Sequence, residues 1–376
     1  MKKTKVFLSA LLMAAVFSFT ACSNASSGSG NNGGDSTPPA PTYSVTIEAS
    51  TNGTVSASKT SDISAGETIT LTVTPAVTVD DDYKLGTLSV KNGDADVAVT
   101  NNAFTMPSGN VKVTATFDAI VYYGTKKPSK AKEVGDIVFN DGSAMAYTAF
   151  ESLDEDAKTA KKAAAIALIF YKGTGLNSDA ADGTPDTTTS RTLGVGLKHD
   201  RNKPAWCLDS ANAYSKNITT IKCPASGSAG AFTFTGDKDG SNNLEQIKTF
   251  LSAEGSGTTD DTGTAANYPA FDFTKNYSAT ATNLGTAYAS GWYLPSLAEL
   301  FQIYANGKGA DKVFDIDAAS QALGGDKFKV EWYWSSSPHT SNPRYACVIA
   351  FENGDWGGVT KNDAGQSYVC AIRAFN

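Results

Sequence analysis

The chain has 376 residues, 41% of them hydrophobic, and a formal net charge of −7 at pH 7. This length predicts two or three domains, and the hydrophobic content is ordinary for a globular protein. The acidic balance argues against nucleic-acid binding, because that function requires basic side chains that neutralise phosphates. The sequence also has no arginine-rich patch, since its only arginines are Arg191, Arg201, Arg344 and Arg373.

Residues 1–22 read as an export signal. A basic start, Met1–Lys5, precedes an apolar stretch from Val6 to Phe19 that is too short for a mature membrane span. The small residues before Cys22 resemble a bacterial lipobox, which implies that Cys22 is lipid-modified. Simple secretion without a lipid is the alternative. Removal of the signal takes away three lysines and changes the formal charge from −7 to −10.

Residues 23–42 predict a flexible tether. They contain no large apolar side chain, so burial cannot offset the entropy lost on ordering them. A lipid on Cys22 would hold the protein on a membrane without spanning it. We therefore expect an exported protein anchored to the bacterial membrane, at the outer membrane or the cell surface.

Residues 43–118 predict a small all-β module. Polar and apolar residues alternate in 43–47, 68–73 and 111–117, which is typical of half-buried strands. Asn52-Gly53 and Asn92-Gly93 are strong signals for hairpin turns.

This module resembles the bacterial repeat family that includes the internalin B-repeats. The residues that carry the resemblance are Gly53-Thr54-Val55, Ala65–Thr68, Leu71–Pro75 and Phe104–Val111. The resemblance implies a spacer or adhesion module of a surface protein. Because only one copy occurs, we expect a short stalk rather than a binding unit.

Residues 119–133 are expected to be a linker, and residues 134–376 one larger α+β domain. Its composition predicts a helix over 154–165 that runs into a strand over 166–171. A second helix is expected from Asn243, with the Asn243 side chain as the N-cap. A third is expected after Ser296 and Glu299, which form a capping box.

Three segments of the larger domain resemble a bacterial C-type lectin-like domain. They are Gly291–Leu300, Tyr333–Ser337 and Ile372–Phe375, and the relatives in question are treponemal variable proteins and Lcl-type adhesins. The resemblance implies two helices packed on small antiparallel sheets. It also implies a ligand surface in the last third of the domain, which a retroelement diversifies in the variable proteins. The fold expected overall is an α+β C-type lectin-like domain preceded by the small all-β bacterial-repeat module.

Between Tyr333–Ser337 and Ala371–Phe375 the sequence is rich in polar and aromatic residues. We expect strands 345–351 and 367–374 to pair and to hold the intervening loops rigid, as antibody frameworks hold their loops. Each candidate residue has a structural alternative, such as a simple hairpin turn at Asn353. The predicted ligand contacts are His339, Asn342, Arg344, Tyr345, Asn353, Asp355, Trp356, Asn362 and Asp363.

Four cysteines follow Cys22, and an even number in an exported protein predicts disulfides with three possible connectivities. Cys207–Cys223 is a plausible local pair, and Cys347–Cys370 would join the two expected strands. Formylglycine-generating enzymes share the C-type lectin-like fold and use cysteines, so an enzyme of that type is the alternative from another class.

The sequence offers no convincing catalytic constellation, and we expect no enzyme activity, no cofactor and no metal. His199 and His339 are the only histidines, and neither has zinc-ligand spacing. The function expected is adhesion or recognition by a surface lipoprotein. Its expected partner is a protein or glycan on a host or neighbouring cell, with no nucleic acid; an adhesin without diversification is the alternative within this class.

Overall fold

The computed structural model describes residues 39–177, 186–221, 237–253, 266–339 and 341–376. The predicted signal, Cys22 and most of the predicted tether lie outside these residues. The described residues divide into two compact units. The first comprises 39–49, 55–73 and 88–115, and the second comprises 50–54, 74–87 and the described residues from 116 onward.

The strands of the N-terminal module lie in residues 42–119. They are β1 (Thr42–Tyr43), β2 (Val45–Ile47), β3 (Gly53–Ala57), β4 (Ile63–Ser64), β5 (Thr68–Pro75), β6 (Tyr83–Asn92), β7 (Ala95–Val97), β8 (Ala103–Thr105) and β9 (Val111–Ala119). Their sheets have the orders β2-β9-β6-β7, β3-β5-β8 and β1-β4. In β5, Ile69 and Leu71 are buried while Thr68, Thr70 and Thr72 are exposed, so the predicted alternation is confirmed.

The predicted turn after Asn92 is also confirmed. Asn92 pairs with Ala95, which leaves Gly93 and Asp94 as a two-residue hairpin loop. Gly93 has φ of 61°, in the left-handed region that such loops require.

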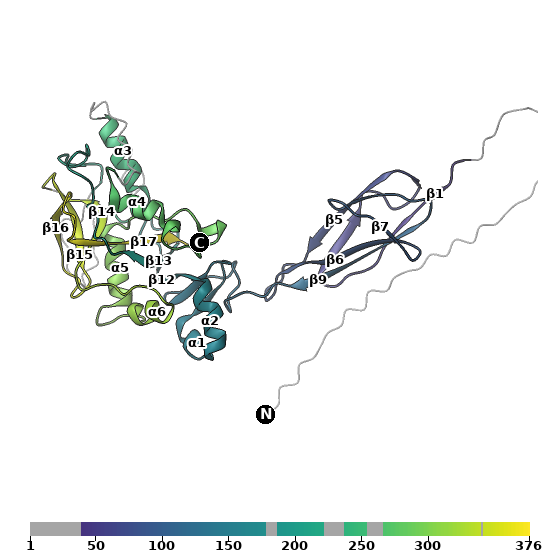
Figure 1. The fold of residues 1–376 in the computed structure, drawn as a ribbon, viewed down its shortest axis with the longest axis horizontal. Coiled ribbons are helices and arrows are strands. Elements are labelled where there is room, and N and C mark those ends of the chain that lie inside the picture. The colour runs from purple at the N-terminus through teal and green to yellow at the C-terminus, as the bar shows by residue number, and fades with distance from the viewer. Residues whose placement is uncertain (1–38, 178–185, 222–236, 254–265, 340) are drawn as a thin grey trace, which may run out of the picture. The chain divides into compact units, whose positions relative to one another are not determined.

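All elements after β9 lie in the second unit (Figure 1). Its strands are β10 (Asp136–Phe139), β11 (Ala144–Ala146), β12 (Ala165–Gly173), β13 (Arg191–Asp200), β14 (Trp332–Pro338), β15 (Tyr345–Ala350), β16 (Trp356–Thr360) and β17 (Ser367–Ala374). Its helices are α1 (Tyr147–Glu151), α2 (Glu155–Ala164), α3 (Asn243–Ala253), α4 (Pro269–Lys275), α5 (Leu297–Gly307) and α6 (Ile316–Ala322), with short 3-10 helices η1 (Gly240–Asn242), η2 (Tyr277–Ala279) and η3 (Thr286–Tyr288).

One eight-stranded sheet organises this unit, in the order β11-β10-β12-β13-β17-β14-β15-β16. Helices cover both of its faces, as the packing of two neighbouring residues of β15 demonstrates. Ile349 packs in one hydrophobic cluster with Leu300 of α5, whereas Val348 packs in another with Leu251 of α3. Successive side chains of a strand point to opposite faces, so α5 and α3 lie on opposite sides of the sheet.

This architecture is larger than the expected two helices on small antiparallel sheets. The chain as a whole is mainly β-sheet with few helices, and its N-terminal module is all β. The final strand, β17, pairs with β13 and β14, so it lies in the middle of the sheet.

The predicted pairing of strands 345–351 and 367–374 is wrong. Strand β14 lies between them, antiparallel to β15 and parallel to β17. The residues Tyr333–Ser337 of β14 are all buried, as befits a strand with a neighbour on each side. An alternating pattern identifies a strand but carries no information about which strand pairs with it.

Local helix signals were predicted well where the capping groups are close in sequence. Asp154 caps α2, which runs directly into β12. The capping box of α5 is present, with both Ser296 and Glu299 bonded. The cap predicted at Asn243 is wrong, because η1 precedes α3 and the Asp239 side chain accepts from Ser241 N instead.

The segment expected to be a linker belongs to the second unit, and part of it packs there. Lys126 exchanges backbone hydrogen bonds with Ala144 of β11. Its Nζ also lies 2.5 Å from the Asp136 carboxylate. Within residues 119–133, the chain around Lys126 therefore follows the edge of the sheet.

Lys361, which follows β16, is a buried cation that joins the segment 213–216 to the loop before β15. Its side chain is fully buried, and Nζ donates to the carbonyls of Ala213 and Pro343 at 2.7 Å and of Lys216 at 3.2 Å. Nζ also lies 5.0 Å from the centre of the Trp206 ring. Burial lowers the pKa of Lys361 to about 8, only partly opposed by Cys207.

His199 is the second buried titratable group of structural importance. Its Nδ1 lies 3.0 Å from the Tyr333 hydroxyl, and its ring centre lies 4.5 Å from that of Phe328. Burial lowers the pKa of His199 to about 3, and the charges of Arg201 and Lys329 act in the same direction. The imidazole is therefore neutral in the folded protein at pH 7.

We predict that Lys361→Met lowers the free energy of unfolding by about 2–4 kcal/mol, because one buried and two partly buried carbonyls lose their donor. Urea denaturation of the full chain measures the change. Lys248→Met, at a lysine that is 56% exposed on α3, should change it by less than about 0.5 kcal/mol. The difference in free energy of unfolding between the wild type and Lys361→Met should grow from pH 8 toward 10.5. In this range the Lys361 amine is neutral in the folded wild type and takes up a proton on unfolding, so the wild type gains stability as the pH rises. Equal effects of the two substitutions would contradict this role for Lys361.

We predict that His199 makes the protein sensitive to acid. Its folded pKa lies below the ordinary value of 6.5, so its contribution to stability is complete above pH 6.5 and falls as the pH drops toward 3. His199→Asn should be less stable at pH 7 but lose less stability between pH 6.5 and 4. Denaturation curves at several pH values measure how the free energy of unfolding changes with pH in the wild type and in His199→Asn. Identical pH dependence in the two proteins would refute this role for His199.

Candidate ligand-binding site

The nine predicted contact residues fall into two groups at opposite ends of β15. The first group, which we call the loop surface, comprises His339, Asn342, Arg344, Tyr345, Asn362 and Asp363. Its two loops meet because Tyr345 is in register with Thr360, and Lys361 N donates to Arg344 O at 2.8 Å.

The second group, the distal turn, comprises Asn353, Asp355 and Trp356. Trp356 pairs with Ile349, near the other end of β15. Ile349 lies four residue steps along the strand from Tyr345, which corresponds to about 14 Å. The structure thus does not bring the nine residues together into one surface.

The loop surface is ordered by its own hydrogen bonds. His339 Nδ1 accepts from Asn342 N at 3.2 Å, and Asn342 Oδ1 accepts from Arg344 N at 3.0 Å. The His339 ring packs edge-on against Tyr345, with ring centres 6.0 Å apart. The exposed Arg344 guanidinium lies 5.7 Å from the centre of the Tyr214 ring. Sequence reasoning missed Tyr214, which comes from a distant segment.

The distal turn has the geometry of a self-contained hairpin connection. Asn353 Oδ1 accepts from Asp355 N at 3.0 Å, and Asn353 Nδ2 donates to Asp355 Oδ2 at 2.5 Å. Gly354 has φ of 76°, and the half-buried Trp356 packs against the core cluster that contains Ile349. These contacts match the structural alternative for this group.

The cysteines do not form the pair expected across the last strands. Cys370 is a free, fully buried thiol, and β14 separates its strand from that of Cys347. Burial raises the pKa of the Cys370 thiol far above its ordinary value. Cys207 is also buried, but Cys223 lies outside the described residues, so the second expected pair is not covered by the structure.

Within the described ranges, no group of three or more His, Cys, Asp or Glu side chains is placed to hold a metal ion. A search of the same residues finds no helix long and apolar enough to cross a membrane.

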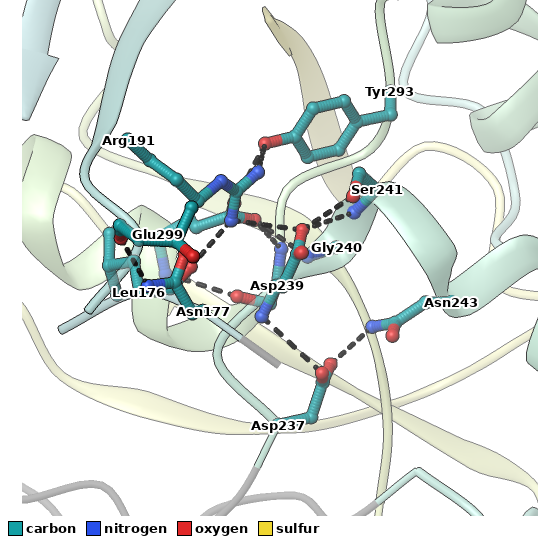
Figure 2. A network of polar contacts seen from close by, with 12 residues as sticks. Leu176, Asn177, Arg191, Asp237, Asp239, Gly240, Ser241, Asn243, Tyr293 and Glu299 are labelled. Atoms are coloured by element: carbon teal, nitrogen blue, oxygen red, sulfur yellow. Dashed lines mark hydrogen bonds and ion pairs between the residues drawn. The ribbon is translucent and has the colours of Figure 1, made fainter. Parts of the chain in front are cut away.

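A buried polar network that sequence reasoning missed lies around Glu299 (Figure 2). Glu299 is fully buried, and its Oε2 accepts from Ser296 N at 2.8 Å and from Gly240 N at 2.9 Å. Its Oε1 accepts from the Tyr293 hydroxyl at 2.8 Å and lies 3.4 Å from Arg191 Nη1. The capping residue of α5 thus also joins η1 and β13.

Arg191 is the cation of this network (Figure 2). Its Nη1 donates to Leu176 O at 2.5 Å and lies 3.0 Å from Asp239 Oδ1, while Nη2 donates to the Tyr293 hydroxyl at 2.8 Å. One guanidinium therefore lies within ion-pair distance of two acidic side chains. Burial, with the charge of Asp239 adding to it, raises the pKa of Glu299 to about 8, against the opposing effect of Arg191.

Asp237 extends the network toward β14. Its carboxylate accepts from Asn243 Nδ2, which also donates to Ser336 Oγ at 2.8 Å. Burial raises the pKa of Asp237 to about 7. The sequence signal for the network is an arginine, Arg191, at the start of a strand whose residues are buried as far as Leu197.

A cavity of about 540 Å³ lies beside Arg191. Its walls include Arg191, Asp239, Ser241, Trp292, Tyr293 and Arg373. Of these residues, Trp292 is buried in the core.

Residues 43–121 match the family described as Divergent InlB B-repeat domain. No curated protein matches the chain. Among solved structures, one similar chain is described as the crystal structure of a fimbrial protein from Bacteroides ovatus ATCC 8483. The identity is 15% and the TM-score 0.43, over 88% of this chain and 69% of that chain. A similarity this low assigns neither fold nor function, whereas the family match identifies the N-terminal module as a bacterial repeat.

Proposed function

We propose that this protein is a surface-anchored binding lipoprotein whose C-terminal head, resembling a C-type lectin-like domain, contacts its ligand through the loop surface. The observation that carries this proposal is the division between buried frame and outward loops. Tyr333–Ser337 and Ala371–Ile372 are buried in adjacent strands, while Arg344 is exposed and Asn342, Asn362 and Asp363 are partly exposed. A rigid frame with polar and aromatic loops favours ligand binding, because little entropy is lost when the loops engage.

The anchoring of the loops supports the same function. Lys361 binds the carbonyls of Pro343 and Ala213, so both loops and the segment that carries Tyr214 share one buried cation. Arg and Tyr are enriched among residues that dominate binding energy. Here the Arg344 guanidinium of the loop surface lies against the Tyr214 ring. The proposed partner is a protein or glycan on a host or neighbouring cell.

Two narrower versions of this function differ in whether the loops vary. In the first, a retroelement diversifies the coding region between the two buried landmarks. In the second, the protein is an adhesin with a fixed loop sequence. A near-copy of that coding region beside the gene, differing at adenines, would distinguish the first from the second.

The positions of the thiols argue against the alternative function, an enzyme of the formylglycine-generating type. Catalytic cysteines are accessible and have a lowered pKa. Cys207, Cys347 and Cys370 are all buried, and the pKa of Cys370 is raised. We therefore propose a binding protein without catalytic activity.

We predict that ligand binding depends on one end of β15 and not on the other. A variant with His339, Asn342, Arg344 and Asn362 all changed to Ala should bind at least about thirtyfold more weakly, since contacts of this kind contribute 2 kcal/mol or more at hot spots. The measurement is binding of the full chain to an array of glycans and matrix proteins, followed by titration of the ligand found.

The matched control removes polar side chains at the distal turn. Asn353→Ala with Asp355→Ala deletes a self-bonded pair at the other end of the same hairpin. This variant should keep its affinity within about threefold, as distant sites act independently. Loss of binding in the control, with retention in the loop variant, would place the ligand on the distal turn and overturn the proposal.

We predict that Cys22→Ala releases the protein from the membrane fraction. The reason is that the acyl chains on this cysteine would supply the anchor, whose strength grows with each buried methylene group. Fractionation of cells that express the full chain measures the distribution. A variant that stays with the membrane would show that Cys22 does not carry the anchor.

A further inference from the structure

The cavity beside Arg191 lies away from the loop surface. Arg373 contributes to its wall from near the end of β17, whereas Asn362 and Asp363 precede the start of this strand. Six residues of strand separate Ser367 from Arg373, which corresponds to about 20 Å. Any ligand of this cavity therefore contacts residues other than those of the loop surface.

The Arg373 guanidinium is held between a backbone and a ring. Its Cζ lies 5.0 Å from the centre of the Tyr288 ring, and Gly291 lies on another side. A Cβ at Gly291 would approach Arg373 Nη1 to 3.0 Å, so this backbone lies close to the guanidinium, and the φ of 86° at Gly291 favours glycine there. These two contacts fix the orientation of the guanidinium.

The hydrogen-bonding capacity of Arg373 is largely unused. Nη2 donates to Ala287 O at 3.2 Å. Nε and Nη1 are buried and have no hydrogen-bond partner among the described residues. Among the described residues, no carboxylate forms an ion pair with Arg373. Arg191, in the same cavity, faces both Asp239 and Glu299. One arginine of the cavity wall is compensated and the other is not.

A partly buried cation without a counter-charge is costly, and hydrogen bonds to ionised groups are the strongest that proteins make. An anion that enters the cavity would lower this cost. Asp239 lies on the same wall and repels a second negative charge. The volume of about 540 Å³ lies in the range that small molecules occupy.

We propose that this cavity binds a small molecule with a single carboxylate, which it places against Arg373. Asp239 and Ser241 lie on the same wall and offer hydrogen bonds to hydroxyl or ammonium groups of the ligand. An acidic sugar and a free α-amino acid share this chemistry. Phosphate, sulfate and citrate do not, because each carries more negative charge than the cavity compensates.

The test uses the small number of arginines in the chain. The full chain labelled with ¹⁵N-arginine has four Nε–H groups, and loss of one signal in Arg373→Lys assigns the signal of Arg373. D-Glucuronate and glycine are the two carboxylate probes, and D-glucose is the matched sugar without a carboxylate. We expect the Arg373 signal to shift and saturate with at least one carboxylate probe but not with glucose or citrate. Response to glucuronate alone would indicate the sugar, and response to glycine alone the amino acid.

Two variants separate binding from folding. Arg373→Met should weaken binding at least about tenfold, as expected for a lost charge-assisted hydrogen bond, when measured by calorimetry. Ser241→Phe places a bulky side chain at an exposed position of the wall, and it should abolish binding without lowering the midpoint of thermal unfolding. Arg201→Lys, at an exposed arginine outside the cavity, should bind as the wild type does.

The proposal fails if neither carboxylate probe shifts the Arg373 signal, or if Ser241→Phe binds the probe as tightly as the wild type. Equal shifts of all the arginine signals would indicate non-specific association and would also overturn it. None of these outcomes bears on the loop surface, whose test uses other residues and a different ligand panel.

Discussion

Strand β14 carries three consecutive buried serines, and the need to pair their hydroxyl groups determines how the second unit is assembled. Buried polar groups are costly unless they are hydrogen-bonded. Ser335 Oγ donates to Cys347 O at 2.7 Å, Ser336 Oγ accepts from Asn243 Nδ2, and Ser337 Oγ accepts from Leu297 N at 3.1 Å. Through these bonds one strand is fixed to β15, to α3 and to the start of α5.

The position of the loop surface follows from this arrangement. Because β14 is tied to helices on both faces of the sheet, its end at Pro338 fixes where the first loop begins. Lys361 fixes the second loop from the other side through the carbonyl of Pro343. The loops are therefore held at both ends by buried polar bonds, although their own residues are polar and partly exposed. Binding residues on a rigid scaffold are the common arrangement in proteins that recognise other molecules.

Sequence patterns predicted the features whose causes lie within a few residues. The capping box of Ser296 and Glu299 and the turn at Gly93 are local, and both were predicted correctly. Asn243 failed as a cap because Ser336, almost a hundred residues away, holds its side chain. The pairing of β15 with β17 failed for the same reason, since only tertiary packing decides that β14 lies between them. The network of Arg191, Tyr293 and Glu299 likewise joins distant segments, so no spacing rule could reveal it.

The four arginines show how charge is distributed over a chain whose acidic residues outnumber its basic ones, 38 to 31. Arg191 and Arg201 each form ion pairs with carboxylates. Arg344 and Arg373 form none with the described residues, and each lies against a tyrosine ring instead. In an acidic protein a carboxylate partner is easily supplied, so an arginine that packs on a ring keeps its charge available to a ligand. The two arginines in this state lie at the loop surface and at the cavity, where ligand binding is proposed for separate physical reasons.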